Sequence, residues 1–155
     1  MATLTVTHTE SITLDAGSGA ETRGSVNSLS IAGINEIYER TVTCVTGQAT
    51  TIATFGASAH TAANNIDTAD VRYIRVTNLS AASKDLELGL RFTAHSYTVA
   101  LKAGHTHVLG NAAALGLTDD DASTVDFGTM TDLISIVVRN DSGTATPVEL
   151  FIAAV

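Results

Sequence analysis

Two histidines separated by one residue, His105 and His107 in the stretch LKAGHTHVLGN, are the residues of this chain whose spacing comes closest to chemistry. Residues i and i+2 of a β-strand point to the same face of a sheet, so both imidazoles could reach one metal ion. A mononuclear site then needs one or two further ligands and groups that orient the imidazoles. Because no further ligand is evident, we expect neither metal nor cofactor, and His105 and His107 are the only metal candidates.

The alternative interpretation gives the two histidines a structural place on a strand. Both would then face water or a neighbouring subunit, while alternate residues of the same region face the core, namely Tyr97, Val99, Leu101 and Val108. A third interpretation applies to an oligomer. Beside a three-fold axis the pair would be presented three times and could close a metal site or a pH-sensitive cluster that no single chain contains.

The spacing of His105 and His107 is similar to that of the cupins, a family of jelly-roll metalloenzymes in which a glutamate ligand follows such a pair within a few residues. This chain departs from that pattern. The sequence after His107 runs VLGNAAALGLTDDD, which contains no Glu and reaches its first acidic residue at Asp119. The remaining histidines, His8, His60 and His95, stand isolated in the sequence. A cupin-like metal protein is therefore an alternative that lacks its acidic ligand.

Other candidate chemical groups have simpler explanations. The acidic run TDDDASTVD, residues 118–126, lacks the alternating spacing and central Gly of a calcium-binding loop and is typical of a solvated acidic loop. Cys44 alternates with Thr and Val in TVTCVTG, which indicates a buried strand thiol without an activating partner. Glu36 and Glu39 lie at odd spacing in a β stretch, so they point to opposite faces and do not form a glycosidase pair. We expect a protein that is not an enzyme.

The charge balance excludes two classes of partner. Lys and Arg number 8 against 16 Asp and Glu, which gives a net charge of −8. A nucleic-acid binder needs a basic surface that replaces counterions on phosphate, and an anionic membrane attracts basic segments, so we expect neither partner. The opening residues MATLTVTHTESITL have no basic region followed by an apolar run, so no signal peptide is expected. The partner that remains is another protein or a glycan.

Period-two alternation of apolar and polar residues runs along the whole chain and predicts an all-β protein. Thr, Val and Ile, which favour sheets, are abundant, whereas aromatic residues make up only 5%. The pattern occurs in about nine segments: TLTVTHTESITL, NEIYERTVTCV, TTIATFG, VRYIRVTN, DLELGLRF, SYTVAL, HTHVLG, DLISIVVRN and PVELFIAAV. We therefore expect one domain over residues 1–155, an antiparallel, jelly-roll-like β-sandwich whose residues 1–25 form an N-terminal arm and loop.

Turn residues separate these segments. NDSGTATP, ahead of the last segment, predicts a hairpin connection, and KAG at residues 102–104 predicts a tight reversal. Three stretches have no strand pattern and are expected to be irregular, namely residues 15–25, 56–70 and 111–124. The last of them could hold one helical turn around residues 112–115.

Three segments together resemble the C-terminal part of small structural proteins of tailed bacteriophages. They are DVRYIRVTNLSAASKDLELGLRF, SYTVALKAGHTHVLGN and ISIVVRNDSGTATPVELFIAAV, which lie within residues 70–155. The likeness lies in a strand ending in RVTN, a turn of the form L-x-A-G and a final connection rich in Gly, Thr and Ser. Residues 1–69 agree with such proteins only in style, and the resemblance carries over no functional residue.

The resemblance implies a β-sandwich or jelly roll that decorates or cements a capsid. The expected function is that of a non-enzymatic virion protein, made in the host cytoplasm, which binds the major capsid protein on the head surface and associates with itself, as a trimer. Within this class the alternative is a component of the tail, a fibre or the collar. A carbohydrate-binding jelly roll is a further alternative. Exposed aromatic residues usually form glycan sites, and here most aromatics occupy strand positions that indicate burial.

Overall fold

The computed structural model describes residues 1–16, 19–58, 65–81, 83–93, 95–117 and 130–155. These residues form fifteen β-strands, which confirms the expected all-β class. The chain divides into two compact units, Met1–Asn35 and Glu36–Val155. Nowhere in the described part of the chain is there a helix of the length and apolar character that a membrane span requires.

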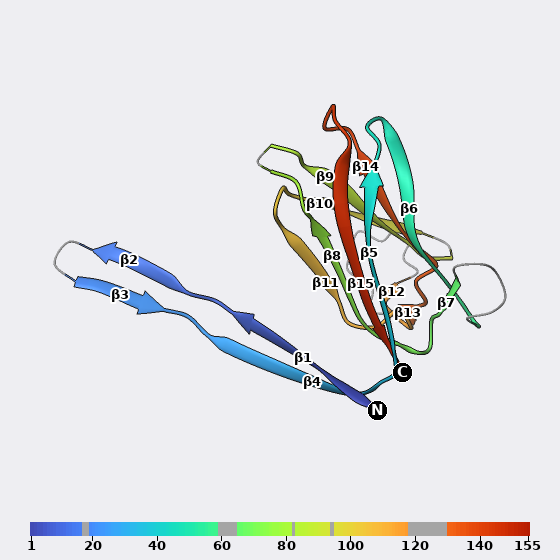
Figure 1. Ribbon diagram of the computed structural model, residues 1–155, viewed down its shortest axis with the longest axis horizontal. Helices are drawn as coiled ribbons and strands as arrows, with labels where there is room; N and C mark the ends of the chain where they lie inside the picture. Colours follow the sequence, from blue (N-terminus) through green and yellow to red (C-terminus); the bar gives the residue numbers. More distant parts are fainter. Residues whose placement is uncertain (17–18, 59–64, 82, 94, 118–129) are drawn as a thin grey trace. The chain divides into compact units, whose positions relative to one another are not determined.

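The first unit is a two-stranded ribbon, which we call the arm. It contains β1 (Ala2–Thr9), β2 (Ile12–Ala16), β3 (Gly19–Arg23) and β4 (Val26–Ile34). β1 pairs with β4 and β2 pairs with β3, both antiparallel, and the Glu10 amide donates to the Ser25 carbonyl (2.9 Å) between the two pairs. Figure 1 shows the result as one long hairpin. Residues 15–16 and 19–23 thus belong to strands and not to the irregular loop expected from their composition.

The second unit, which we call the body, has two principal sheets. The four-stranded sheet has the order β11-β8-β15-β5 and the five-stranded sheet the order β10-β9-β14-β6-β7. Their strands are β5 (Glu36–Cys44), β6 (Gln48–Gly56), β7 (Asn65–Asp67), β8 (Val71–Asn78), β9 (Leu86–Arg91), β10 (Ser96–Leu101), β11 (Thr106–Leu109), β14 (Ser135–Asn140) and β15 (Thr146–Ala154). A small third sheet pairs β12 (Gly116–Leu117) with β13 (Met130–Thr131).

The order of these strands is that of a jelly roll. Leaving out the short β7, successive strands of the body alternate between the two sheets, in the chain order β5, β6, β8, β9, β10, β11, β14 and β15. The one exception is β9 and β10, which are neighbours in the same sheet. This alternation produces two interlocked sheets, each of four antiparallel strands, as in jelly-roll proteins. The short β7 adds to the five-stranded sheet in parallel with β6. Figure 1 shows the two sheets packed face to face.

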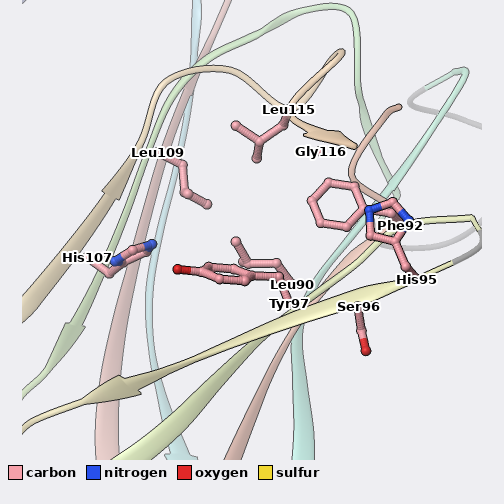
Figure 2. Close-up of a pocket in the computed structure, with 9 residues that line it drawn as sticks. All are labelled: Leu90, Phe92, His95, Ser96, Tyr97, His107, Leu109, Leu115 and Gly116. Carbon is pink, nitrogen blue, oxygen red and sulfur yellow. The ribbon is translucent and has the colours of Figure 1, made fainter. Parts of the chain in front are cut away.

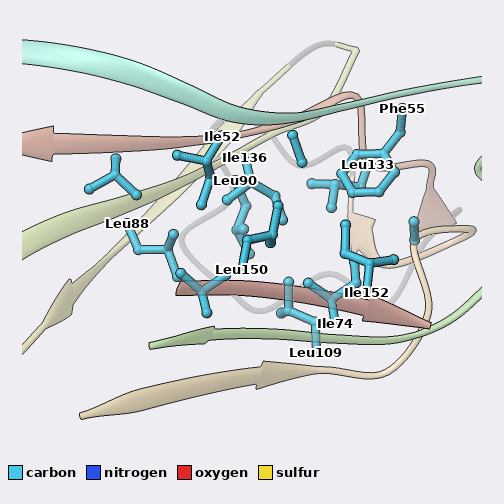
Figure 3. Packing of buried hydrophobic residues seen from close by; sticks show 14 of the residues in the cluster. Ile52, Phe55, Ile74, Leu88, Leu90, Leu109, Leu133, Ile136, Leu150 and Ile152 are labelled. Atoms are coloured by element: carbon cyan, nitrogen blue, oxygen red, sulfur yellow. The ribbon is translucent and has the colours of Figure 1, made fainter. Parts of the chain in front are cut away.

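The core lies between the two sheets and follows from the period-two pattern. On β9, Leu86, Leu88 and Leu90 all point inward and are almost completely buried. Ile74 of β8 and Ile152 of β15 belong to the same core on the other sheet, and Figure 3 shows them across from Leu88 and Leu90. Each such side chain stabilises the fold by about 1.5–3 kcal/mol relative to its exposed state. Buried aliphatic side chains between the two sheets therefore stabilise the body, and aromatic residues contribute little to the core.

Two buried asparagines hold the loops that follow β8 and β14. Asn78 donates its side-chain amide to the carbonyls of Lys84 (2.8 Å) and Leu101 (3.0 Å). Asn140 donates in the same way to the carbonyls of Cys44 (2.7 Å) and Thr144 (2.8 Å). Both side chains are fully buried, so these bonds satisfy amide groups that would otherwise cost free energy.

Two turn predictions had different outcomes. The reversal at residues 102–104 is confirmed, because Gly104 has the positive φ of 73° that such a turn requires. The hairpin expected at NDSGTATP is wrong. β14 and β15 lie in different sheets, so the turn with Gly143 at φ 81° carries the chain across the sandwich. Residues 112–114 form a bend and a turn rather than the helical turn considered above.

Candidate functional site

The structure does not bring His105 and His107 together on one strand face, because β11 begins only at Thr106. His105 precedes the strand and is exposed, and its backbone belongs to the turn. Its amide donates to the Lys102 carbonyl (3.0 Å) and its carbonyl accepts from the Asn78 amide (3.0 Å). Next to it, Lys102 Nζ donates to Asp85 Oδ2 (2.6 Å), and this bond is the main cause of the lowered pKa of Asp85.

His107 occupies an inward-facing position of β11. It pairs with Val76 of β8, whose side chain is fully buried, and it shares its face with the buried Leu109. The expectation that both histidines face water and Val108 faces the core is therefore wrong. Val108 is 52% exposed, whereas His107 is only partly exposed. The inward-facing and outward-facing positions of β11 are therefore exchanged relative to the expectation, because Leu109 rather than Val108 packs in the core.

No metal centre is found among the residues that the structure describes, where no three His, Cys, Asp or Glu side chains lie close enough to share an ion. The acidic run at residues 118–126 and His60 fall outside the described residues. Cys44 is fully buried, as expected, and burial raises the pKa of its thiol, which keeps it in the unreactive protonated form.

The side chains of Tyr38 and Glu36, both on β5, form a hydrogen-bonded pair. The Tyr38 hydroxyl donates to Glu36 Oε2 (2.6 Å), and this bond, with burial and the charge of the carboxylate, raises the pKa of Tyr38 to about 12. Such a phenol stays protonated at neutral pH, so it is a poor general base.

A pocket of about 380 Å³ opens where the edge strands of the two sheets, β10 and β11, lie next to each other. We call it the edge pocket. Leu90, Leu109 and Leu115 form its apolar wall, and Tyr97 and His107 line it from the two edge strands. Figure 2 shows Tyr97 and Leu90 between His107 on one side and Phe92 and His95 on the other. This combination of apolar walls and a few polar groups is typical of small-molecule sites.

The far end of the edge pocket is fixed by close packing. The rings of Phe92 and His95 stack with 4.9 Å between their centroids and 12° between their planes. Gly116 lies against this stack so closely that a Cβ there would come within 3 Å of three Phe92 ring atoms. His95 Nδ1 is buried and has no hydrogen-bond partner among the described residues.

Tyr97 was expected to face the core. Its side chain lies on the inner face of β10, as expected, but outside the core. Val99 and Leu101 of the same strand pack on or within the core, whereas Tyr97 is 54% exposed. The difference arises because Tyr97 lies on an edge strand, opposite Leu90 and beside the open pocket. The alternation of apolar and polar residues predicts which face of a strand a side chain lies on, but it does not predict where the space between the two sheets opens to solvent.

The arm is the second candidate surface. In β1 and β4, Leu4 pairs with Ile31 and Val6 pairs with Leu29, so these four apolar side chains share one face. The opposite face carries Thr and Ser, including the Thr7–Ser28 hydroxyl pair at 3.2 Å. Leu29 is 58% exposed. Neither strand contains Asp, Glu, Lys or Arg, although the whole chain contains 24 charged residues, 8 basic and 16 acidic.

The edge pocket could not be found from local sequence signals, and of the arm only residues 1–25 were expected, without the pairing of β1 with β4. The pocket joins residues of β9, β10, β11 and the segment before β12, and the arm depends on pairing between residues about 25 positions apart. Only the aliphatic-Thr alternation of residues 2–9 pointed to an amphipathic strand. Compared with known protein families and with curated proteins, the chain matches none.

Proposed function

We propose that this protein is a non-enzymatic structural protein of a virus particle, a cement or decoration protein of a tailed-phage head. It binds the outer surface of the head through protein–protein contacts with the major capsid protein and with further copies of itself, as a trimer. The arm is the observation that supports the proposal most strongly, because its composition and exposure suit a surface that is completed by a partner.

A two-stranded ribbon of this kind is at best marginally stable by itself in water. Within the described residues of the unit Met1–Asn35, each strand pairs on one edge only, and no second layer covers the apolar face of Leu4 and Leu29. Soluble proteins usually protect such strands with charged residues, prolines or bulges. β1 and β4 contain neither charged residues nor proline, and their one register shift is at Ala2 and Thr3. Such a ribbon is suited to pairing with another chain.

Two modes of contact are available to the arm. Its edge can add to a strand of a partner sheet, where main-chain hydrogen bonds provide affinity and alternate side chains provide specificity. Its apolar face can at the same time cover an apolar surface of the partner. Burial of Leu29, which is 58% exposed, would then contribute favourable free energy at about 25 cal/mol per Å² of apolar area.

The body fits the same role. Jelly rolls occur in viral capsid proteins, in lectins and in cupins, and the described residues lack the metal cluster that a cupin requires. The net charge of −8 would keep unassembled copies soluble and apart. The uncharged ribbon of β1 and β4 would allow close approach to a partner without desolvating charged groups.

The proposal is tested with heads from a phage that lacks this gene. Purified protein is titrated onto such heads, and the bound fraction is measured by sedimentation. We expect saturable binding at a simple ratio to the major capsid protein and greater resistance of the heads to heat. A version that lacks residues 1–35 keeps the body but should bind far more weakly. No binding by the full chain would contradict the proposed function.

A further inference from the structure

The edge pocket has the features of a ligand site that the proposed structural role does not use. At about 380 Å³ it lies near the lower end of the range of small-molecule pockets. It is open to solvent along the edge strands β10 and β11, so a ligand attached to a larger molecule could enter. Strands supply part of its wall, with Leu90 on β9 and Leu109 on β11, and this part is preformed.

The apolar and aromatic surface of the pocket suits a flat ligand with a nonpolar face. The Tyr97 ring is 54% exposed although it faces the inner side of its strand, so part of the ring is available to a ligand. Leu90 is its cross-strand neighbour, and Leu115 lines the pocket from the segment before β12. Figure 2 shows the Tyr97 hydroxyl directed toward His107.

The polar groups of the pocket lie at its two ends. His107 and the Tyr97 hydroxyl stand at one end, and His95 stands at the other, stacked on Phe92. The Nδ1 atom of His95 is buried and has no hydrogen-bond partner in the described part of the chain. Among the described residues that line the pocket there is no Asp, Glu, Lys or Arg, and a neutral ligand suits such a lining.

We propose that the edge pocket binds one neutral sugar ring, free or at the end of a glycan chain. A pyranose has a C–H face that packs on an aromatic ring and a rim of hydroxyls that both donate and accept hydrogen bonds. Tyr97 and Leu90 contact the nonpolar face, and His107 and His95 bond to hydroxyls at opposite ends of the ring. The inference concerns the body alone and is independent of the arm's role.

The test uses NMR titration of the full chain with neutral monosaccharides (glucose, galactose, mannose and N-acetylglucosamine) and with short oligosaccharides that end in each of them. We expect saturable shifts at Tyr97 and His107 with millimolar or tighter affinity for at least one series. Equal binding of a monosaccharide and its oligosaccharides identifies one ring as the ligand, and tighter binding of the oligosaccharides identifies a chain end. No saturable shift with any probe, or stronger binding of an acidic sugar, would overturn the proposal.

Variants locate the site. Tyr97→Ala should weaken binding about tenfold or more, since an aromatic contact can supply up to about 1.5 kcal/mol and 1.4 kcal/mol is tenfold. Tyr97→Phe should retain most of the binding because it keeps the ring. His107→Ala should also weaken binding, whereas Val108→Ala, at the exposed position on the opposite face of β11, should leave it unchanged. Wild-type affinity in folded Tyr97→Ala protein would contradict the assignment.

Discussion

Val6 of β1 lies directly opposite Leu29 of β4, and the two side chains share the apolar face of the arm, while Thr7 and Ser28 share the opposite, polar face. An amphipathic ribbon ordinarily rests its apolar face on a second layer. In its described residues the arm is a single ribbon two strands wide, and Leu29 is 58% exposed. The arm therefore has the side-chain pattern of a surface suited to a partner's apolar face, and the proposed function rests on this pattern.

A charge on the apolar face of the arm should abolish assembly without unfolding the body. Leu29→Asp places a carboxylate where the partner would bury a leucine, and an unpaired buried charge costs several kcal/mol. Ser30→Asp adds the same charge at the next residue, on the polar face, and serves as the matched control. We expect loss of head binding for Leu29→Asp and near-normal binding for Ser30→Asp, measured by co-sedimentation. Equal effects of the two substitutions would contradict the assignment of faces.

Asn140 should be among the polar residues on which the stability of the body depends most. Asn140→Ala removes two donated hydrogen bonds and leaves the carbonyl of Cys44 buried without its amide partner. Each unsatisfied buried group costs about 1–3 kcal/mol, so a fall of at least that size is expected in the free energy of unfolding.

Equilibrium urea denaturation measures this effect. Asp141→Ala is the control, because the ion pair between Asp141 and Arg139 (2.7 Å) is largely exposed and contributes at most about 1 kcal/mol. A loss no larger for Asn140→Ala than for Asp141→Ala would show that the asparagine does not hold the loop.

The thiol of Cys44 should be inert in the folded protein. Burial raises its pKa above the ordinary value of 9.0, so the protonated form is favoured by folding. The associated stability is fully present below the unfolded pKa and is lost as the pH rises through the folded pKa. We therefore expect stability to decline in alkaline solution, and Cys44→Val should remove that part of the decline.

The rate of reaction with a thiol-specific reagent gives an independent measurement of the same property. At pH 8 modification should be slow in buffer and fast in denaturant. Rapid modification of the native protein would mean that β5 does not bury this side chain as described.

Gly116 should be required for the closed end of the edge pocket. Gly116→Val would drive a side chain into the buried Phe92 ring, and the strain of such overpacking typically costs about 1–3 kcal/mol. Gly110→Val is the control, since a Cβ there meets no atom within 4 Å. Thermal unfolding should detect a lower midpoint for the first variant alone, and NMR should report displacement of His95. Equal midpoints would place Gly116 away from Phe92.

The sequence predicted most of the body because its strands are half buried and alternate accordingly. Eight of the nine expected segments correspond to the eight principal jelly-roll strands, and the ninth lies in the arm. The strand VNSLSIAGI, β4, was missed because Ser and Gly weaken its pattern and its partner β1 is remote in the chain. NDSGTATP was taken for a hairpin because the same turn residues serve both within one sheet and between two sheets.

The candidate site was harder to predict. The face on which His107 lies depends on where the turn at Gly104 ends and β11 begins, and a shift of one residue exchanges inside and outside. The neighbourhood of His107, Tyr97 and His95 is a tertiary property of the two edge strands. No spacing within the sequence encodes it. Of the two histidines that the spacing singles out, His107 lines the edge pocket and His105 does not.

The most direct test of the central claim is the copy number of this protein in purified virions, measured by quantitative mass spectrometry against the major capsid protein. The proposed function predicts a simple ratio to the capsid subunits and retention of the protein on heads separated from tails. Absence from the particles would contradict it, and a few copies confined to the tail fraction would contradict the assignment to the head.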